Sequence, residues 1–132
     1  MSAASHFTFE FSTDSLKQLY DDYISVTSAV GIDRLNRNAF EKNLDNEIHL
    51  ISRKILEGSY RFSQYKEKLI SKGAGKYPRV ISIPTFRDRT TLRALCNVLR
   101  KTYAEFLRAK LPQHIISEIR ESLTTGKHRY FL

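Results

Sequence analysis

The amino-acid sequence predicts an α+β fold that is mostly helical and carries one β-hairpin. Apolar residues recur at steps of three or four in several segments, which is the spacing of amphipathic helices. Two extended segments flank a glycine-rich turn, which is the pattern of a hairpin. Capping and stop residues stand at the borders of the helical segments, so the fold class follows from local signals.

The first 30 residues predict an arm followed by a helix. In residues 1–13, three phenylalanines alternate with polar residues, which predicts a short strand or an arm that docks elsewhere: Phe7, Phe9 and Phe11. Asp14 can cap a helix over residues 15–28, because the apolar residues there share one face.

A second helix is predicted after the interruption at Gly31-Ile32-Asp33. Asn36 or Asn38 can cap it, and Gly58 fits its C-terminal end. Its apolar residues follow helical steps: Phe40, Leu44, Ile48, Ile51 and Ile55.

The hairpin is predicted from two extended segments, residues 60–70 and 78–83. The flexible turn Lys72-Gly73-Ala74-Gly75-Lys76 joins them and gives the hairpin a basic tip.

A long helix is predicted from Thr85, its N-cap, to about Lys110, with Asp88 at the third helical position. Its expected apolar face comprises Leu92, Leu95, Cys96, Leu99, Tyr103, Phe106 and Leu107. After Pro112 a shorter amphipathic helix is predicted to end near Thr125-Gly126. Its apolar residues are Ile115, Ile116, Ile119 and Leu123. The segment His128–Leu132 is expected to begin a buried strand.

The charge distribution indicates a polyanionic partner. The chain of 132 residues has 22 Lys and Arg against 14 Asp and Glu, a formal net charge of +8. The segment from Arg53 to Lys110 holds 15 basic and 4 acidic residues, whereas the remainder holds 7 and 10. Such a segment can follow a phosphate backbone and release its counterions. A solvated basic surface is the alternative.

Several kinds of site and location find no support in the sequence. The single cysteine, Cys96, excludes an internal disulfide and is expected to be a small buried side chain. The four histidines lack metal-ligand spacing. The chain has no run of about 18 apolar residues and no signal-peptide pattern, so we expect a cytoplasmic protein without a membrane partner.

Three short motifs occur in a fixed order. Gly31-Ile32-Asp33 comes first, Tyr60-Arg61 second, and the sharpest is Arg79-Val80-Ile81-Ser82-Ile83-Pro84-Thr85-Phe86-Arg87-Asp88-Arg89. In order and spacing, residues 31–132 resemble the fingers blocks of group II intron, retron and related bacterial reverse transcriptases. Phe62-Ser63 and Leu92 depart from the family's usual proline region and glutamine, which favours a divergent branch such as the defence-associated enzymes.

The resemblance implies roles for the basic residues. Lys72 and Arg79 match the positions that grip the triphosphate of the incoming nucleotide, Arg by its planar fork and Lys as a point charge. Seven others are expected to contact nucleic acid: Arg61, Lys66, Lys68, Lys76, Arg87, Arg89 and Arg93. Asp88 is expected to be structural, capping helix amides, and Arg89 could pair locally. The candidate base-stacking residues are Tyr60, Phe62 and Tyr65.

No catalytic or metal-binding residue is predicted in this chain. The family's palm has one metal-binding aspartate just beyond a strand like Tyr130-Phe131-Leu132, and a later Tyr-x-Asp-Asp pair, and neither block is present. The fold is therefore expected to be truncated before the palm of a right-hand polymerase, and the chain alone should be inactive. Mg²⁺ is expected only with the missing palm.

The predicted organisation has three parts: residues 1–30, an N-terminal arm and helix; residues 31–111, the fingers region; and residues 112–132, a helix and an incomplete palm strand. The resemblance implies the fingers part of an RNA-directed DNA polymerase that holds template RNA, primer or DNA and the incoming dNTP, with a role in antiviral defence. One alternative is a freestanding, non-catalytic RNA-binding or regulatory protein. Another is an assembly module whose exposed faces dock on another protein, with the charge serving mainly solubility. The remaining polymerase domains or a protein partner are also expected as binding partners.

Overall fold

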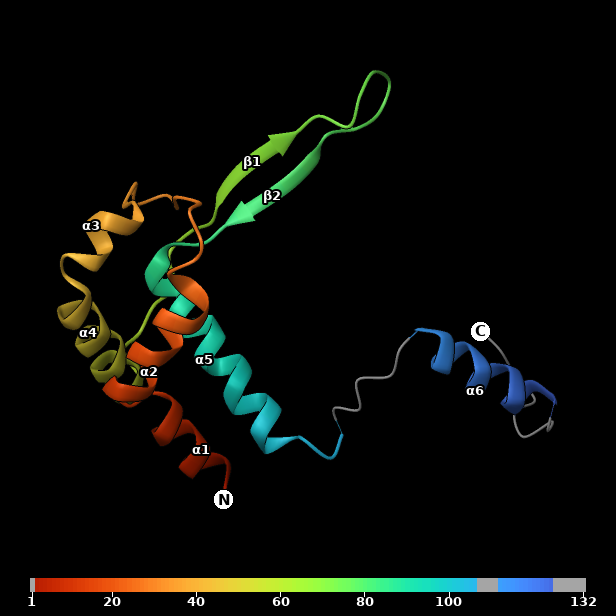
Figure 1. Cartoon of the computed structure of the whole chain (residues 1–132), viewed down its shortest axis with the longest axis horizontal. Coiled ribbons are helices and arrows are strands. Elements are labelled where there is room, and N and C mark those ends of the chain that lie inside the picture. Colours follow the sequence, from red (N-terminus) through yellow and green to blue (C-terminus); the bar gives the residue numbers. More distant parts are fainter. Residues whose placement is uncertain (1, 107–111, 125–132) are drawn as a thin grey trace. The chain divides into compact units, whose positions relative to one another are not determined.

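The computed structural model describes residues 2–106 and 112–124 of the chain (Figure 1). Among these residues the fold is α+β and mostly helical, with one two-stranded antiparallel sheet, as the sequence predicted. The chain divides into two compact units, Met1–Thr102 and Tyr103–Leu132. The first unit holds a helical body and the hairpin, and the second holds a single helix among its described residues.

The N-terminal segment is a helix, α1 (Ala3–Glu10), so the predicted strand is wrong. The Ser2 hydroxyl caps it by accepting a hydrogen bond from a backbone N–H of the first turn. The Phe7 and Phe11 rings lie one turn apart with centroids 4.8 Å apart, and Phe11 is fully buried, whereas Phe9 is exposed. The segment is helical because two of its rings then pack on the core from one helix face, although the alternation of phenylalanines is typical of a strand.

The helix predicted over residues 15–28 begins earlier and ends sooner. Helix α2 (Thr13–Leu19) starts after Ser12, whose side chain accepts a hydrogen bond in the first turn, so Ser12 is the cap and Asp14 is not. The chain continues into a π-helical turn, η1 (Tyr20–Ile24). The sequence gives no local signal for that change of helical pitch.

The second predicted helix is divided by a turn into α3 (Arg37–Glu41) and α4 (Leu44–Leu56). Asn36 is the cap of α3, because its side-chain oxygen accepts a hydrogen bond from Ala39 N at 2.8 Å. Gly58 has a φ of 72° and lies just past the end of α4, which confirms it as the predicted stop.

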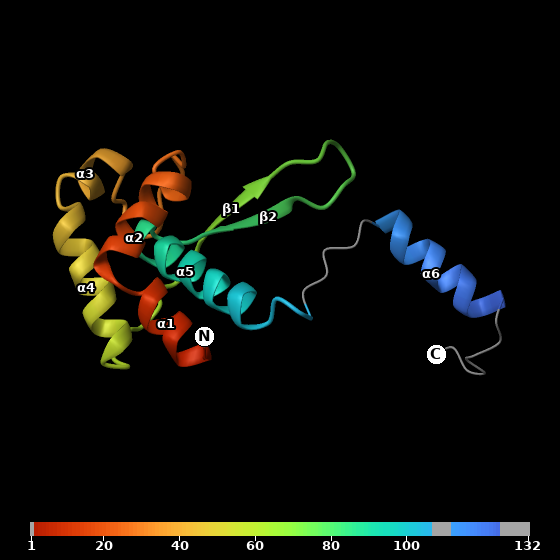
Figure 2. The ribbon, with the colours of Figure 1, turned by 60° about the horizontal axis from the view of Figure 1, so that its bottom comes forward.

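The predicted hairpin is confirmed as β1 (Lys66–Ile70) paired with β2 (Arg79–Ile83). The first strand is shorter than predicted, because residues 60–65 run without a strand partner. The hairpin projects away from the helical body of its unit (Figures 1 and 2).

Helix α5 (Phe86–Thr102) begins at the predicted place. The Thr85 hydroxyl accepts a hydrogen bond from Asp88 N at 3.2 Å, so Thr85 is the N-cap and Asp88 is the third helical residue. The helix ends earlier than predicted: residues 103–106 form turns, and residues 107–110 lie outside the described part.

The buried face of α5 also differs from the predicted one. Leu92 and Leu99 are exposed, and Cys96 is only partly buried. The buried residues are Phe86, Asp88, Thr90, Thr91, Ala94 and Val98. The two buried threonines donate hydrogen bonds to carbonyls four residues back, which makes their burial tolerable.

The second unit contains helix α6 (Pro112–Thr124), as predicted. Its apolar residues are about half exposed: Ile115, Ile116, Ile119 and Leu123. The expected helix end at Thr125-Gly126 and the expected strand at His128–Leu132 lie outside the described residues.

The core of the first unit contains a row of aromatic rings. Ring centroids lie 5.5 Å apart for Tyr20 and Phe40, and 5.6 Å apart for Phe40 and Phe86. All three side chains are buried. Because Phe86 follows β2 by three residues, the core ends directly at the base of the hairpin.

Candidate nucleic-acid interface

The hairpin has one face that is basic and aliphatic. Three cross-strand pairs share this face: Lys66–Ile83, Lys68–Ile81 and Ile70–Arg79. The opposite face carries Glu67–Ser82 and Leu69–Val80. Nearly all of these side chains are exposed, and only Ile81 and Ile83, near the body, are half-buried. The three cations therefore lie on one side of an open ribbon.

The tip of the hairpin adds two more cations. Gly73 and Gly75 have φ values of 102° and 75°, which a residue with a side chain rarely adopts, and they let the chain reverse. Ser71 stabilises the turn by accepting a hydrogen bond from Gly73 N at 3.3 Å. Lys72 and Lys76 flank these positions and are exposed to solvent.

The first leg of the hairpin, residues 60–65, is held at its base by the Asp88 carboxylate. The Tyr60 hydroxyl donates to Oδ1 at 2.7 Å, and the Ser63 backbone N–H donates to Oδ2 at 3.0 Å. Asp88 is 1% exposed, and burial also raises the pKa of Tyr60. The predicted structural role of Asp88 is confirmed, but its side chain binds the hairpin leg and not the helix amides.

The second leg is held by Arg89. Its Nε donates to the Pro84 carbonyl at 3.1 Å, just after β2. Its Nη1 donates to Thr27 Oγ1 at 2.9 Å, and its Nη2 donates to the Ala29 carbonyl. Burial lowers the pKa of the guanidinium, which nevertheless stays charged. Arg89 therefore bonds locally to Pro84 and also joins the end of the hairpin to a distant loop.

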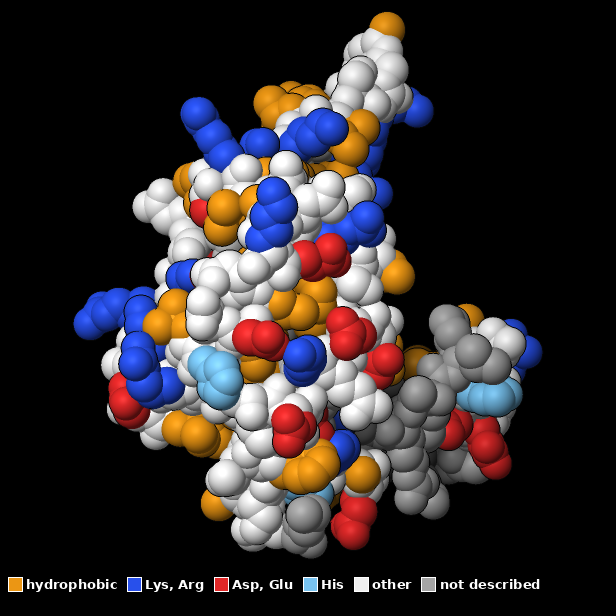
Figure 3. All heavy atoms as spheres, turned by 60° about the vertical axis from the view of Figure 1, so that its left-hand side comes forward, with side chains coloured by type: hydrophobic (Ala, Val, Ile, Leu, Met, Phe, Trp, Pro, Cys, Tyr) orange, Lys and Arg blue, Asp and Glu red, His pale blue; other side chains and the backbone are white. Residues whose placement is uncertain are grey.

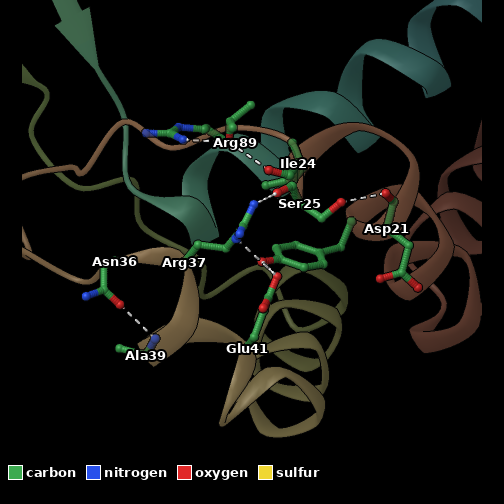
Figure 4. Close-up of polar contacts among 10 residues, drawn as sticks. Asp21, Ile24, Ser25, Asn36, Arg37, Ala39, Glu41 and Arg89 are labelled. Atoms are coloured by element: carbon green, nitrogen blue, oxygen red, sulfur yellow. Dashed lines mark hydrogen bonds and ion pairs between the residues drawn. The ribbon is translucent and has the colours of Figure 1, made fainter.

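That loop, between η1 and α3, is itself anchored to the body. Arg37 Nη1 donates to the Ser25 carbonyl at 2.9 Å, and Tyr20 donates to Glu41 Oε1 at 3.3 Å (Figure 4). Arg37 reaches the loop from α3, and Arg89 reaches it from α5 (Figure 4). Burial beside Glu41 raises the pKa of Tyr20 to about 12.

Two further arginines of α5 also have partners within the body. Arg87 Nε donates to Glu47 Oε2 at 2.7 Å, and its Nη2 lies 2.5 Å from the same oxygen. The Arg93 guanidinium carbon lies 3.9 Å from the centroid of the Tyr23 ring, a cation–π contact.

The nine predicted site residues thus separate into two groups. Three are held by the body: Arg87, Arg89 and Arg93. Six lie on the hairpin or on the leg that leads into it: Arg61, Lys66, Lys68, Lys72, Lys76 and Arg79. Within the part of the chain that the structure describes, the side chains of these six have no hydrogen bond or ion pair. We refer to them as the free hairpin cations.

Exposed aromatic side chains accompany these cations. Phe62 and Tyr65 are each 50% exposed, and Phe62 packs edge-on against Tyr60. Tyr77, at the tip, is 94% exposed. Sequence reasoning did not select Tyr77, although its position between a lysine and a proline beside the glycine-rich turn could have indicated it. Planar groups among cations are typical of surfaces that bind single-stranded nucleic acid.

The two charge types are unevenly distributed on the surface. In Figure 3, many Lys and Arg side chains lie along the hairpin and the adjoining end of the body, and a second group lies on one flank of the body. Most Asp and Glu side chains on this face lie farther from the hairpin (Figure 3). A polyanion would therefore meet the least repulsion near the hairpin.

In residues 2–106 and 112–124, no three His, Cys, Asp or Glu side chains gather in a way that could hold a metal ion. Across those two ranges, no helix combines the length and apolar character needed to cross a bilayer. The expectation that Mg²⁺ accompanies only a palm stays a prediction.

No family model matches the chain, and no curated protein matches it. The proposed function therefore rests on the geometry of the hairpin and on the motifs of the sequence.

Proposed function

We propose that the hairpin binds single-stranded nucleic acid through its phosphates and bases. The observation that carries this proposal is the set of six free hairpin cations, which have no protein partner among the described residues. An exposed cation without a partner can bind a phosphate at a low cost in free energy, because no ion pair must first be broken. Cations held by the body would lose a contact in doing so.

The exposed aromatic residues favour a single strand over a duplex. Tyr77, Tyr65 and Phe62 offer ring faces on which unpaired bases can stack, whereas paired bases are already stacked on one another. The hairpin supplies charge and stacking surface on exposed strands, so it suits binding with little base preference.

A finer proposal follows from the motifs. The chain is the fingers region of an RNA-directed DNA polymerase that acts in the cytoplasm in antiviral defence, and Lys72 and Arg79 hold the incoming dNTP. The motif from Arg79 to Arg89 supports this, as does the register, because Lys72 lies two residues beyond Ile70, the strand partner of Arg79. Mg²⁺ would then be bound by aspartates of a palm outside this sequence.

Binding of a labelled single-stranded RNA across a range of salt concentrations tests the main proposal. The variant Lys66→Ala/Lys68→Ala/Arg79→Ala removes three cations from one hairpin face. Each lost phosphate contact should reduce the slope of log K against log salt by about 0.7, so the triple variant should lose about 2.

A matched control removes the same charge elsewhere. The variant Lys42→Ala/Arg53→Ala/Arg100→Ala takes three exposed cations from the helical body. If binding depends only on net charge, both triple variants should weaken equally. That result, or equal slopes for the hairpin variant and the wild type, would contradict the proposal.

The nucleotide proposal has its own test. Titration of the chain with dTTP and separately with dTMP, followed by amide NMR, should shift resonances near Lys72 and Arg79 only with the triphosphate. The Arg79→Lys variant keeps the charge but loses the planar fork, so it should bind dTTP more weakly. Equal responses to the two nucleotides would reject a triphosphate grip.

A further inference from the structure

We infer that Asp88 and Arg89 are positioning residues, which fix the direction of the hairpin so that its cations reach nucleic acid, without touching it themselves. The part of this inference that concerns binding rests on the proposed function. The part that concerns hairpin orientation stands on the geometry alone.

The two residues are adjacent at the start of α5 but hold opposite legs of the hairpin. Asp88 accepts hydrogen bonds from Tyr60 and Ser63, which precede β1. Arg89 donates to the carbonyl of Pro84, which follows β2. One turn of a helix therefore fixes both points at which the chain enters and leaves the hairpin.

A third contact lies beside these two, at Gly31. Gly31 is buried against the backbone between the hairpin and α5, and a Cβ built on it would lie 2.8 Å from Thr85 Cα and 2.9 Å from Thr85 N. Arg89 holds the loop that leads to Gly31 through Thr27 and Ala29. The loop therefore packs directly against the base of the hairpin.

The hairpin has few other contacts that could fix its direction. Eight of the ten paired strand residues are exposed, and only Ile81 and Ile83 are partly buried. A two-stranded ribbon of this kind has little stability of its own in water. Its orientation therefore depends on the contacts at its base.

The charges of the two residues make positioning distinguishable from direct electrostatics. The variant Asp88→Ala raises the net positive charge, so electrostatics alone would strengthen binding to a polyanion. If Asp88 positions the hairpin, the same variant should weaken binding by about tenfold, because a swinging hairpin must be ordered when RNA binds. The two explanations predict opposite signs.

Arg89→Lys gives the complementary test. The lysine keeps the charge, but its compact ammonium lacks the spread of donors that reaches Pro84, Thr27 and Ala29 together. A phosphate contact at this position would be largely retained by lysine. A positioning role predicts a clear loss of RNA affinity, with a salt slope that changes little because no phosphate contact is removed.

Milder variants guard against loss of the fold. Tyr60→Phe removes only the hydroxyl that Asp88 binds, and Thr27→Val removes one acceptor of Arg89 at nearly constant volume. Far-UV circular dichroism should show the helical body intact in both. Their combination should weaken RNA binding in the same direction as Asp88→Ala.

Hairpin orientation is measured without nucleic acid. Spin labels on Ala74→Cys at the tip and His49→Cys on α4, in a Cys96→Ala background, report the distance between hairpin and body. We expect a narrow distribution for the parent and a broad one for Asp88→Ala and Arg89→Lys. Unchanged narrow distributions would overturn the positioning role.

Failure of this inference differs from failure of the proposed function. If the parent chain binds no RNA but the distance distribution broadens in the variants, the proposed function fails and the positioning role remains. If RNA binds but Asp88→Ala binds as well or better, the positioning role in binding is wrong.

Discussion

The hairpin and the first half of α5 carry cations from the same basic segment, yet the two regions use them differently. On the hairpin, the lysines and arginines face solvent without partners among the described residues. On α5, Arg87 pairs with Glu47, Arg89 joins the hairpin base to a loop, and Arg93 stacks on Tyr23. Local charge density alone therefore does not show which cations are free to bind a ligand.

The difference has a physical cause. A residue of α5 lies against other helices, so carboxylates, carbonyls and rings from distant parts of the chain come within reach of its side chain. A residue of the hairpin has only its cross-strand neighbours, and most of these are aliphatic. Substitutions of Arg87 and Arg93 in α5 should therefore affect stability, whereas substitutions of the free hairpin cations should affect binding.

The largest expected difference is between two aromatic residues. Phe86→Ala removes a fully buried ring from the core and should lower the free energy of unfolding by about 3–5 kcal/mol. Tyr77→Ala at the exposed tip should change it by less than about 0.5 kcal/mol but should weaken RNA binding. Urea denaturation and an RNA titration check both. A large loss of stability with Tyr77→Ala would contradict the claim that the hairpin contributes to binding and not to stability.

The close approach at Gly31 gives the next effect. Gly31→Ala forces the new methyl against the Thr85 backbone and should lower the free energy of unfolding by about 1–3 kcal/mol. Because the strain lies at the hairpin base, RNA affinity should fall as well. An unchanged denaturation midpoint would show that the loop moves aside without cost.

Alkaline pH should destabilise the body through Tyr20. The folded-state pKa is about 12 against 10.0 for the unfolded side chain, so the neutral form favours folding fully below pH 10. That stability should be lost as the pH rises from 10 towards 12, because the unfolded state ionises first. Denaturation of Tyr20→Phe should show a shallower alkaline decline, whereas Tyr77→Phe, the control, should behave like the wild type.

The smallest of these effects compares two single cations. Arg87→Ala leaves Glu47 without its partner and should lower the free energy of unfolding by about 1 kcal/mol. Lys68→Ala should leave stability within about 0.5 kcal/mol and reduce the salt slope of RNA binding by about 0.7. A double-mutant cycle of Arg87 and Glu47 isolates the pair. A reversed pattern would mean that the two groups of cations are wrongly assigned.

The elements that sequence predicted well are those with a complete local signal. Asn36, Thr85 and Gly58 mark helix ends, because a capping hydrogen bond or a left-handed residue involves only near neighbours. The hairpin turn was predictable for the same reason, since its two glycines supply the positive φ angles.

The sequence predictions are wrong where packing between distant segments determines the secondary structure or the buried face. The alternation of three phenylalanines matches a strand, yet Phe7 and Phe11 pack as helical neighbours on the core. In α5 the buried face includes Thr90 and Thr91 and leaves Leu92 and Leu99 exposed. Thr90 and Thr91 can be buried because their hydroxyls donate to carbonyls of the same helix. A prediction from apolar periodicity does not include such polar residues in the buried face.

The candidate site shows the same limit. All nine basic residues could be selected from charge and motif, but their division into free and held groups could not. Arg87 finds Glu47 and Arg89 finds Thr27, which are 40 and 62 residues away in sequence. Only the tertiary structure brings such partners together.

NMR of the arginine side chains during an RNA titration tests the central claim most directly, because each Nε–H reports on its own guanidinium. The account predicts that Arg61 and Arg79 shift with RNA at low salt and return as salt is raised, while Arg87 and Arg93 stay unchanged. Shifts at Arg87 and Arg93 with none at Arg61 and Arg79 would contradict it, because the interface would then lie on α5.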